Sequence, residues 1–167
     1  MITTTLNRIR ACNPCSEGWT KLLAGLGKTK ADDEPLPYSE IVRINGIDDA
    51  LWACRAEPQY AKEWRLFAVW CARQVQHLMT DKRSIAAIDV AERHANGEAT
   101  NEELAAARDA PCAVAWAAAR DAPWDAARYA ARDAPWAAAR YAPWDAAWAA
   151  ARDVQKSEFL RVVARSR

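Results

Sequence analysis

Two cysteines near the start of the chain, Cys12 and Cys15, have the C-x-x-C spacing that can hold half of a zinc site or form a redox pair. A structural zinc site needs four ligands. Thioredoxin-like chemistry needs a βαβ unit around the motif, and the sequence shows no sign of such a unit. The other possible ligands are scattered: Cys54, Cys71, Cys112, His77 and His94. We therefore expect reduced thiols and a proline-containing turn, with no metal and no cofactor. A metal or redox protein remains an alternative.

A second set of side chains recurs every fourth residue between Arg108 and Asp153, where the position holds arginine or tryptophan and, once, cysteine. Arginine and tryptophan often anchor binding interfaces, and a guanidinium can stack on an indole or hold a phosphate. The repeat therefore indicates a surface for a partner or ligand. Its candidate residues are Arg120, Trp124, Arg128, Arg132, Trp136 and Arg140.

The same repeat also has a purely structural interpretation. Single-base changes interconvert the residues found in each column, so slippage of a twelve-nucleotide unit explains the pattern without a binding function. The arginines would then lie along helix edges, with their stems packed on apolar neighbours. Six arginines and six aspartates balance in this tract, so it is not a polybasic arm. We expect nucleic acid to be an improbable partner for this reason.

The geometry of a four-residue period limits the helices that the repeat can form. Each residue turns an α-helix by about 100°, so each repeat moves the arginine and tryptophan row about 40° around the axis. Four prolines interrupt the tract, and an aspartate stands two residues before three of them, as helix N-caps do. These residues are Pro111, Pro123, Pro135 and Pro143, with Asp109, Asp121 and Asp133. We expect short helices of two to three turns, the last and longest from about Ala142 to Val163.

The strongest helix signal upstream of the repeat runs from Pro58 to Met79. Apolar residues recur there at intervals of three and four: Tyr60, Trp64, Phe67, Cys71, Val75 and Leu78. This stripe predicts a central helix in which Trp64, Phe67, Trp70 and Cys71 are buried. Shorter helices are expected over residues 6–12 and over residues 81–95. Three more are expected to begin at the caps Ser16, Ser39 and Asp48, and another at Thr100, which forms a capping box with Glu103.

Composition limits the fold. The chain has 167 residues and a net charge of +1; leucine, isoleucine, valine and phenylalanine make up only 27 of them, against 39 alanines and 9 tryptophans. We expect closely packed helices with indoles filling the gaps. The predicted fold is all-α: a compact helical domain over residues 1–107, with a layer of short proline-punctuated repeat helices over residues 108–167 packed on it.

No motif in the sequence indicates an enzyme. The run from Gly25 to Thr29 resembles the end of a phosphate-binding loop, but the first glycine of that motif would fall at Leu22 and no strand precedes it. No serine-nucleophile motif or paired-carboxylate pattern appears either. The amino-terminal residues lack a signal-peptide core, and no stretch reaches the ~18 apolar residues of a membrane span. We expect a cytoplasmic protein that does not enter a membrane.

A family resemblance gives the functional lead. Residues 64–72, 81–91 and 96–98, followed by the repeats, resemble the bacterial and phage immunity proteins of the Imm-5-like family. Residues 18–29 and 45–52 resemble a module of prophage proteins. The resemblance implies an all-helical fold and a role in toxin neutralisation or phage–host conflict, and it carries no catalytic residues.

We therefore expect a non-catalytic inhibitor or immunity protein that binds and neutralises a toxin or a host defence protein. The alternative from another class is a sponge or receptor that sequesters a small nucleotide signal. A homo-oligomer is compatible with either hypothesis.

Overall fold

The fold is almost entirely helical. The computed structural model describes residues 1–109, 112–120, 123–139 and 144–165. These residues form ten α-helices, a few 3-10 turns and one short antiparallel strand pair, β1 (Thr3–Thr4) with β2 (Leu36–Pro37). The predicted all-α class is confirmed. Within the described ranges, no helix combines the length and the apolar character needed to cross a bilayer.

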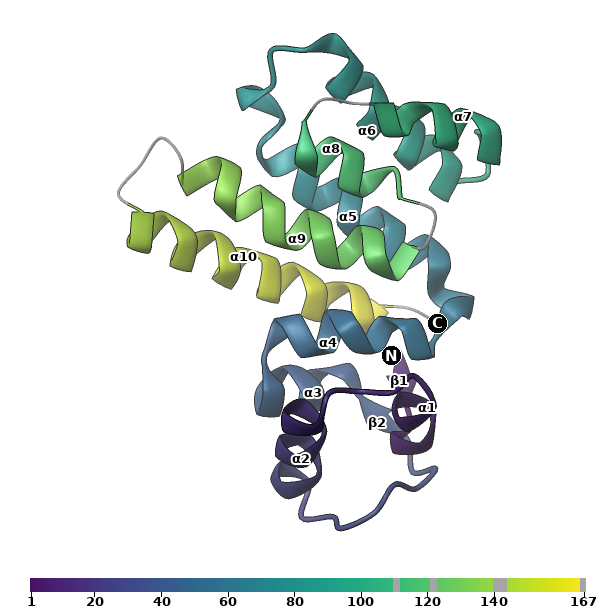
Figure 1. The fold of residues 1–167 in the computed structure, drawn as a ribbon, viewed down its shortest axis with the longest axis vertical. Helices are drawn as coiled ribbons and strands as arrows, with labels where there is room; N and C mark the ends of the chain where they lie inside the picture. Colours follow the sequence, from purple (N-terminus) through teal and green to yellow (C-terminus); the bar gives the residue numbers. More distant parts are fainter. Residues whose placement is uncertain (110–111, 121–122, 140–143, 166–167) are drawn as a thin grey trace.

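Four helices form one end of the molecule (Figure 1): α1 (Leu6–Ala11), α2 (Ser16–Gly25), α3 (Tyr38–Asn45) and α4 (Ile47–Ala53). The sequence predicted the helices but not their caps, because Cys15, Pro37 and Gly46 occupy the positions assigned to Ser16, Ser39 and Asp48. Gly46 ends α3 and starts α4 with φ +94°, a conformation that favours glycine.

The central helix α5 (Ala61–Gln74) is shorter than predicted, because 3-10 turns η2 (Pro58–Tyr60) and η3 (Gln76–Leu78) flank it. Trp64, Phe67 and Cys71 are buried as predicted. The prediction for Trp70 is wrong, since its indole is half-buried and stacks on Phe67 at the edge of the core. The helix expected over residues 81–95 is α6 (Lys82–Ala95), and the structure shows that Asp81 is its N-cap. Helix α7 (Asn101–Ala106) begins at the predicted Thr100 capping box.

The repeat forms α8 (Ala113–Ala118), α9 (Pro123–Ala139) and α10 (Trp144–Arg165). Pro123 opens α9 as predicted, and α10 is the longest helix that the structure describes. Asp109 lies in a 3-10 turn, η4 (Ala107–Asp109). Three of the residues in the proline prediction, Pro111, Asp121 and Pro143, lie outside the described residues.

The prediction that every proline separates short helices is wrong at Pro135, which lies inside α9 together with Asp133. A proline has no amide to donate to the carbonyl four residues earlier, here that of Ala131. Nη1 of Arg152 on α10 donates to that same carbonyl at 3.3 Å. A neighbouring helix thus supplies the donor that Pro135 lacks, and α9 continues through it.

Four aromatic rings form the centre of the core: Tyr38 from α3, Trp64 and Phe67 from α5, and Phe159 from α10. Phe159 lies 5.5 to 6.2 Å from the other three ring centroids, and all four side chains are at most 1% exposed. The Tyr38 hydroxyl donates to the carbonyl of Ala53 at 3.0 Å, so the buried polar group is satisfied. Helices from both ends of the sequence therefore share one core.

Alanine, rather than tryptophan, fills most of the space between the repeat helices and α5. Helix α9 buries a row of small side chains, Ala126, Ala127, Ala130, Ala131 and Ala134, and packs along α5. Small residues let helix axes approach closely, and an indole would hold them apart. Of the tryptophans whose side chains the structure describes, only Trp64 is fully buried, so the expectation that indoles fill the gaps is wrong.

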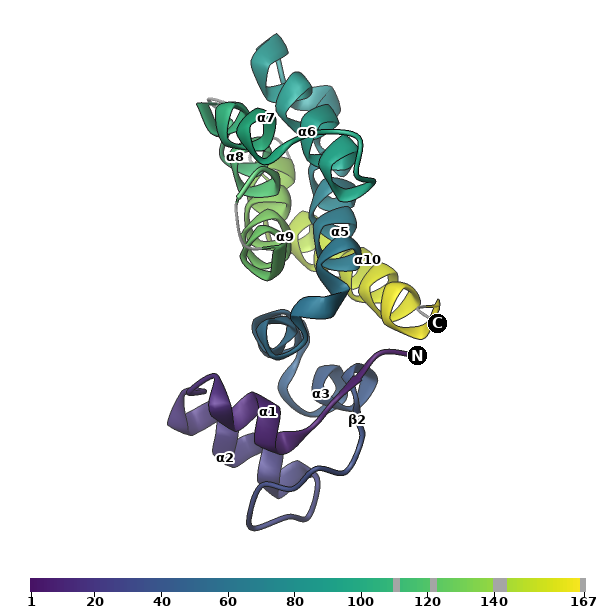
Figure 2. The same ribbon diagram turned by 90° about the vertical axis from the view of Figure 1, so that its right-hand side faces the viewer.

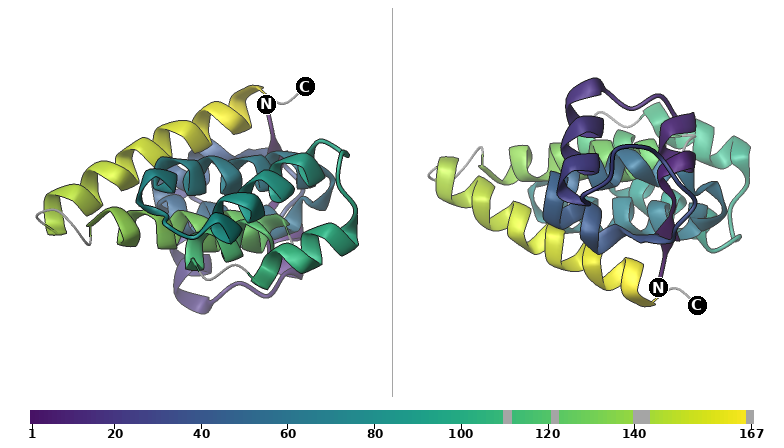
Figure 3. Two further views of the ribbon diagram at one scale, coloured as in Figure 1. Left: turned by 90° about the horizontal axis from the view of Figure 1, so that it is seen from above. Right: turned by 90° about the horizontal axis from the view of Figure 1, so that it is seen from below.

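Helix α10 lies alongside α9 and also contacts α3 and α5 (Figures 1 and 2). Helices before and after residue 107 thus pack directly on one another. The N-terminal strand lies beside the last turns of α10, where the Ile2 amide donates to the Val163 carbonyl at 2.7 Å (Figure 3). Helix α10 therefore connects the two ends of the molecule.

Candidate functional site

Three of the six candidate residues meet around one tyrosine on α9. The guanidinium carbons of Arg120, Arg132 and Arg128 lie 4.4, 4.7 and 5.7 Å from the ring centroid of Tyr129. All three distances are within the ~6 Å reach of a cation–π interaction. We call these four residues the arginine–tyrosine cluster. Arg128 and Arg132 come from α9 itself, whereas Arg120 reaches Tyr129 from just after α8.

Arg120 is the most constrained member of the cluster. Its guanidinium also lies 4.8 Å from the Trp116 ring, four residues earlier, as the repeat spacing predicted. Its Nη2 is 3.8 Å from the Asp125 carboxylate. Its Nε is buried and has no hydrogen-bond partner among the described residues. The Arg120 side chain is therefore held by two rings and one carboxylate, and its Nε–H donor has no acceptor among the described residues.

Asp125 links the cluster to α4. Its carboxylate lies 3.8 Å from Arg120 and 3.8 Å from Arg55, a residue of the 3-10 turn η1 (Cys54–Ala56). The Arg55 guanidinium in turn lies 4.4 Å from the Trp52 ring centroid. Arginines from two distant parts of the sequence therefore share one carboxylate.

The cluster and Arg55 carry more positive than negative charge. Arg132 donates to the Asp133 carboxylate at 2.9 Å, and Asp125 serves both Arg55 and Arg120. No carboxylate in the described part of the chain lies within ion-pair distance of Arg128, whose side chain is exposed. In a chain with a net charge of only +1, this local excess is suited to a negatively charged partner.

The remaining candidate residues do not join the cluster. Trp124 is half-buried against the core. Trp136 is 56% exposed and lies about two turns beyond Tyr129, where it lines a separate cavity of about 560 Å³ with Leu78 and Cys112. Arg140 lies outside the described residues. The six candidate residues thus do not form one continuous surface.

Sequence reasoning missed Tyr129, Asp125 and Arg55 as members of this region. Tyr129 had a signal, because it stands three residues before Arg132 and three-apart residues are neighbours on a helix. Arg55 had none, since only the packing of α4 against α9 brings it to Asp125.

The C-x-x-C motif joins two helices. Cys12 ends α1, and the Cys15 Sγ accepts a hydrogen bond from the Gly18 amide at 3.4 Å at the start of α2. Both thiols are free, and the described residues contain no group of three potential metal ligands. Burial raises the pKa of the Cys54 and Cys71 thiols well above the ordinary value, which keeps both protonated at neutral pH.

The acidic loop at Asp32 and Glu34 is closed by a nearby lysine. The Lys28 Nζ lies 2.5 Å from the Asp32 carboxylate and 2.7 Å from that of Glu34. The hydrogen bond from Lys28 lowers the pKa of Asp32, and the two carboxylates raise the pKa of Lys28. These charges are therefore already paired within the loop.

Comparison of the chain with protein-family models, with curated proteins and with solved structures gave no match.

Proposed function

We propose that this chain is a non-catalytic binding protein of the immunity or anti-defence type. It neutralises a toxin or a host defence protein by holding an acidic segment of that partner against the arginine–tyrosine cluster. The observation that carries this proposal is the convergence of three guanidiniums on Tyr129. The resemblance to immunity proteins supports the class of partner.

The geometry favours recognition because the arginines are already ordered. Binding a partner normally costs about 0.5–1.5 kcal/mol for each flexible side chain that becomes fixed. Stacking on Tyr129 restricts Arg128 and Arg132 before binding, while their side chains stay exposed. A carboxylate of the partner can accept two parallel hydrogen bonds from such a guanidinium. The half-exposed Trp116 ring beside Arg120 adds an apolar contact of the kind that anchors interfaces.

The test begins with capture of binding proteins by the tagged full-length chain from a lysate of its source cells, quantified by mass spectrometry. The cluster variant is Arg128→Gln with Arg132→Gln. The matched control is Arg43→Gln on α3, because Arg43 and Arg132 have similarly exposed side chains, 60% and 62%, and each pairs with one carboxylate. We expect a specific partner to be retained by the wild type and the control and lost from the cluster variant.

The captured protein is then purified and added back. Its binding should weaken as salt increases, because the contact is between exposed charges. Equal capture by the wild type and the cluster variant would refute the assignment of the interface to this cluster.

A further inference from the structure

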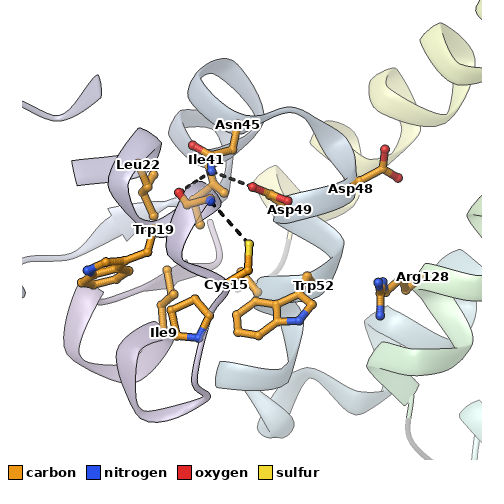
Figure 4. A pocket seen from close by; sticks show the side chains of 13 residues that line it. Ile9, Cys15, Trp19, Leu22, Ile41, Asn45, Asp48, Asp49, Trp52 and Arg128 are labelled. Atoms are coloured by element: carbon orange, nitrogen blue, oxygen red, sulfur yellow. Dashed lines mark hydrogen bonds between the residues drawn. The ribbon is translucent and has the colours of Figure 1, made fainter. Parts of the chain in front are cut away.

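A cavity of about 230 Å³ lies between α2, α3 and α4, beside the arginine–tyrosine cluster (Figure 4). Two indoles, those of Trp19 and Trp52, line it together with apolar side chains of the core. Asn45 and Asp49 lie at one end, and Arg128 approaches from α9 on the other side of Trp52. None of these residues except Arg128 belongs to the surface assigned to the protein partner.

The polar end of this cavity offers one carboxylate, that of Asp49, held in place by Asn45. The Asn45 Nδ2 donates to the Gly18 carbonyl at 2.8 Å and to the Asp49 Oδ2 at 2.6 Å. Both partners are acceptors, so the amide orientation is fixed. The Asn45 Oδ1 is buried and presents no surface to the cavity, so the Asp49 carboxylate is the acceptor at this end. Asp49 is half-buried, and no cation of the described chain lies within ion-pair distance of it. A ligand that fits here must bring N–H donors.

The walls favour a flat ring. The guanidinium of Arg55 lies 4.4 Å from the Trp52 centroid and that of Arg10 lies 5.4 Å from the Trp19 centroid, so both indoles are held in place. Aromatic side chains stack well on the flat faces of nucleobases. The Asp49 carboxylate and the indoles together are suited to a planar heterocycle with donors along one edge.

The charge at the mouth points to an anionic tail. Asp48 lines the mouth but is neutralised by Arg152, whose Nη2 lies 2.5 Å from its carboxylate. Arg128 faces the same opening and has no carboxylate partner in the described residues. The volume is below the roughly 300–1,000 Å³ of sites for drug-sized ligands, so the cavity is suited to a single ring system.

We propose that this cavity is a binding site for a guanine mononucleotide. The base lies against Trp19 and Trp52, its N1–H and 2-amino group both donate to the Asp49 carboxylate, and its phosphate pairs with Arg128. Adenine presents an acceptor at N1 and no 2-amino group, so it does not match this edge. The inference goes beyond the proposed partner binding and rests on different residues, since only Arg128 is shared.

The test is isothermal titration calorimetry of the full chain with GMP, AMP and guanosine. Loss of a bidentate contact to a base and loss of one charged contact to a phosphate should each weaken affinity roughly 5- to 150-fold, which corresponds to about 1–3 kcal/mol. We expect GMP to bind at least about fivefold more tightly than AMP or guanosine. Asp49→Asn should remove the preference for GMP over AMP, and Arg128→Gln the preference for GMP over guanosine.

Cys15 locates the ligand, because its exposed thiol lines the cavity. Saturating GMP should slow alkylation of Cys15 by iodoacetamide, followed by peptide mass spectrometry. The control for Asp49→Asn is Asp153→Asn, a substitution of an exposed aspartate on α10 that should leave GMP binding unchanged. If Asp49→Asn unfolds the chain, Arg128→Gln still tests the site, because it changes an exposed side chain and should leave the fold intact.

Absence of GMP binding at millimolar concentration would overturn the proposal. Equal binding of GMP and AMP by the wild type would do the same, as would an unchanged rate of Cys15 alkylation at saturating GMP. The Arg132→Gln substitution separates the two proposals, because it should weaken the protein partner and leave GMP binding intact.

Discussion

The contact between Arg152 and the Ala131 carbonyl should be coupled to the proline inside α9. The carbonyl is buried, and it has lost its helical donor because residue 135 is proline. Replacing Arg152 by Met leaves this carbonyl unsatisfied, which costs about 1–3 kcal/mol. In a chain that also carries Pro135→Ala, the new amide at residue 135 bonds to the carbonyl, and that part of the cost disappears.

A double-mutant cycle isolates the energy of the hydrogen bond between Arg152 and the Ala131 carbonyl. Arg152→Met also breaks the contacts to Asp48 and Gln155, but it breaks them equally with proline or alanine at residue 135, so they cancel. We expect Arg152→Met to be less destabilising in the Pro135→Ala background by about 1–2 kcal/mol. The free energies come from urea unfolding followed by circular dichroism. A coupling energy within about 0.3 kcal/mol of zero would refute the compensation.

Two further predictions concern the core. Phe159→Ala should lower the free energy of unfolding by about 3–5 kcal/mol, because the ring is fully buried among three aromatic side chains. Trp70→Ala should lower it by only about 1–2 kcal/mol, because the larger indole is half-buried. The opposite order in urea unfolding would contradict this prediction. Burial keeps Cys54 and Cys71 protonated in the folded chain, while both ionise in the unfolded chain above their ordinary pKa of 9.0. The contribution of these two thiols to stability should therefore be constant below that pH and fall above it, by up to about 1.4 kcal/mol per thiol per pH unit. Equal unfolding free energies at pH 8 and pH 10 would show that this assignment is wrong.

The helices could be predicted from the sequence where local signals decide them. The capping box at Thr100 acts through backbone amides within three residues, so it is visible in a short stretch of sequence. The roles of Gly46 and Pro135 could not be predicted from nearby residues. Gly46, and not Asp48, is the N-cap of α4, because α3 and α4 meet at one residue with positive φ. Pro135 fits inside α9 because Arg152, on a helix packed against α9, donates the missing hydrogen bond.

The residues of the candidate site likewise fall into those that local sequence signals identify and those that only tertiary packing brings together. The repeat identified Arg120, Arg128 and Arg132, but their shared ring, Tyr129, was not among the candidates. The cavity residues Asn45, Asp49 and Trp52 form no binding motif in the sequence and meet Trp19 only when α2 packs on α3 and α4. Periodicity reports which side chains share a helix face, and it does not report which helix covers that face.

The most direct test of the central claim is the dissociation constant of the purified partner for three forms of the chain: wild type, Arg128→Gln with Arg132→Gln, and Arg43→Gln. If the partner binds through charge-assisted hydrogen bonds to the arginine–tyrosine cluster, the double variant should bind at least about tenfold more weakly. The Arg43 control, whose side chain is equally exposed on α3, should bind as the wild type does. A double variant that binds the partner as tightly as the wild type would contradict the account.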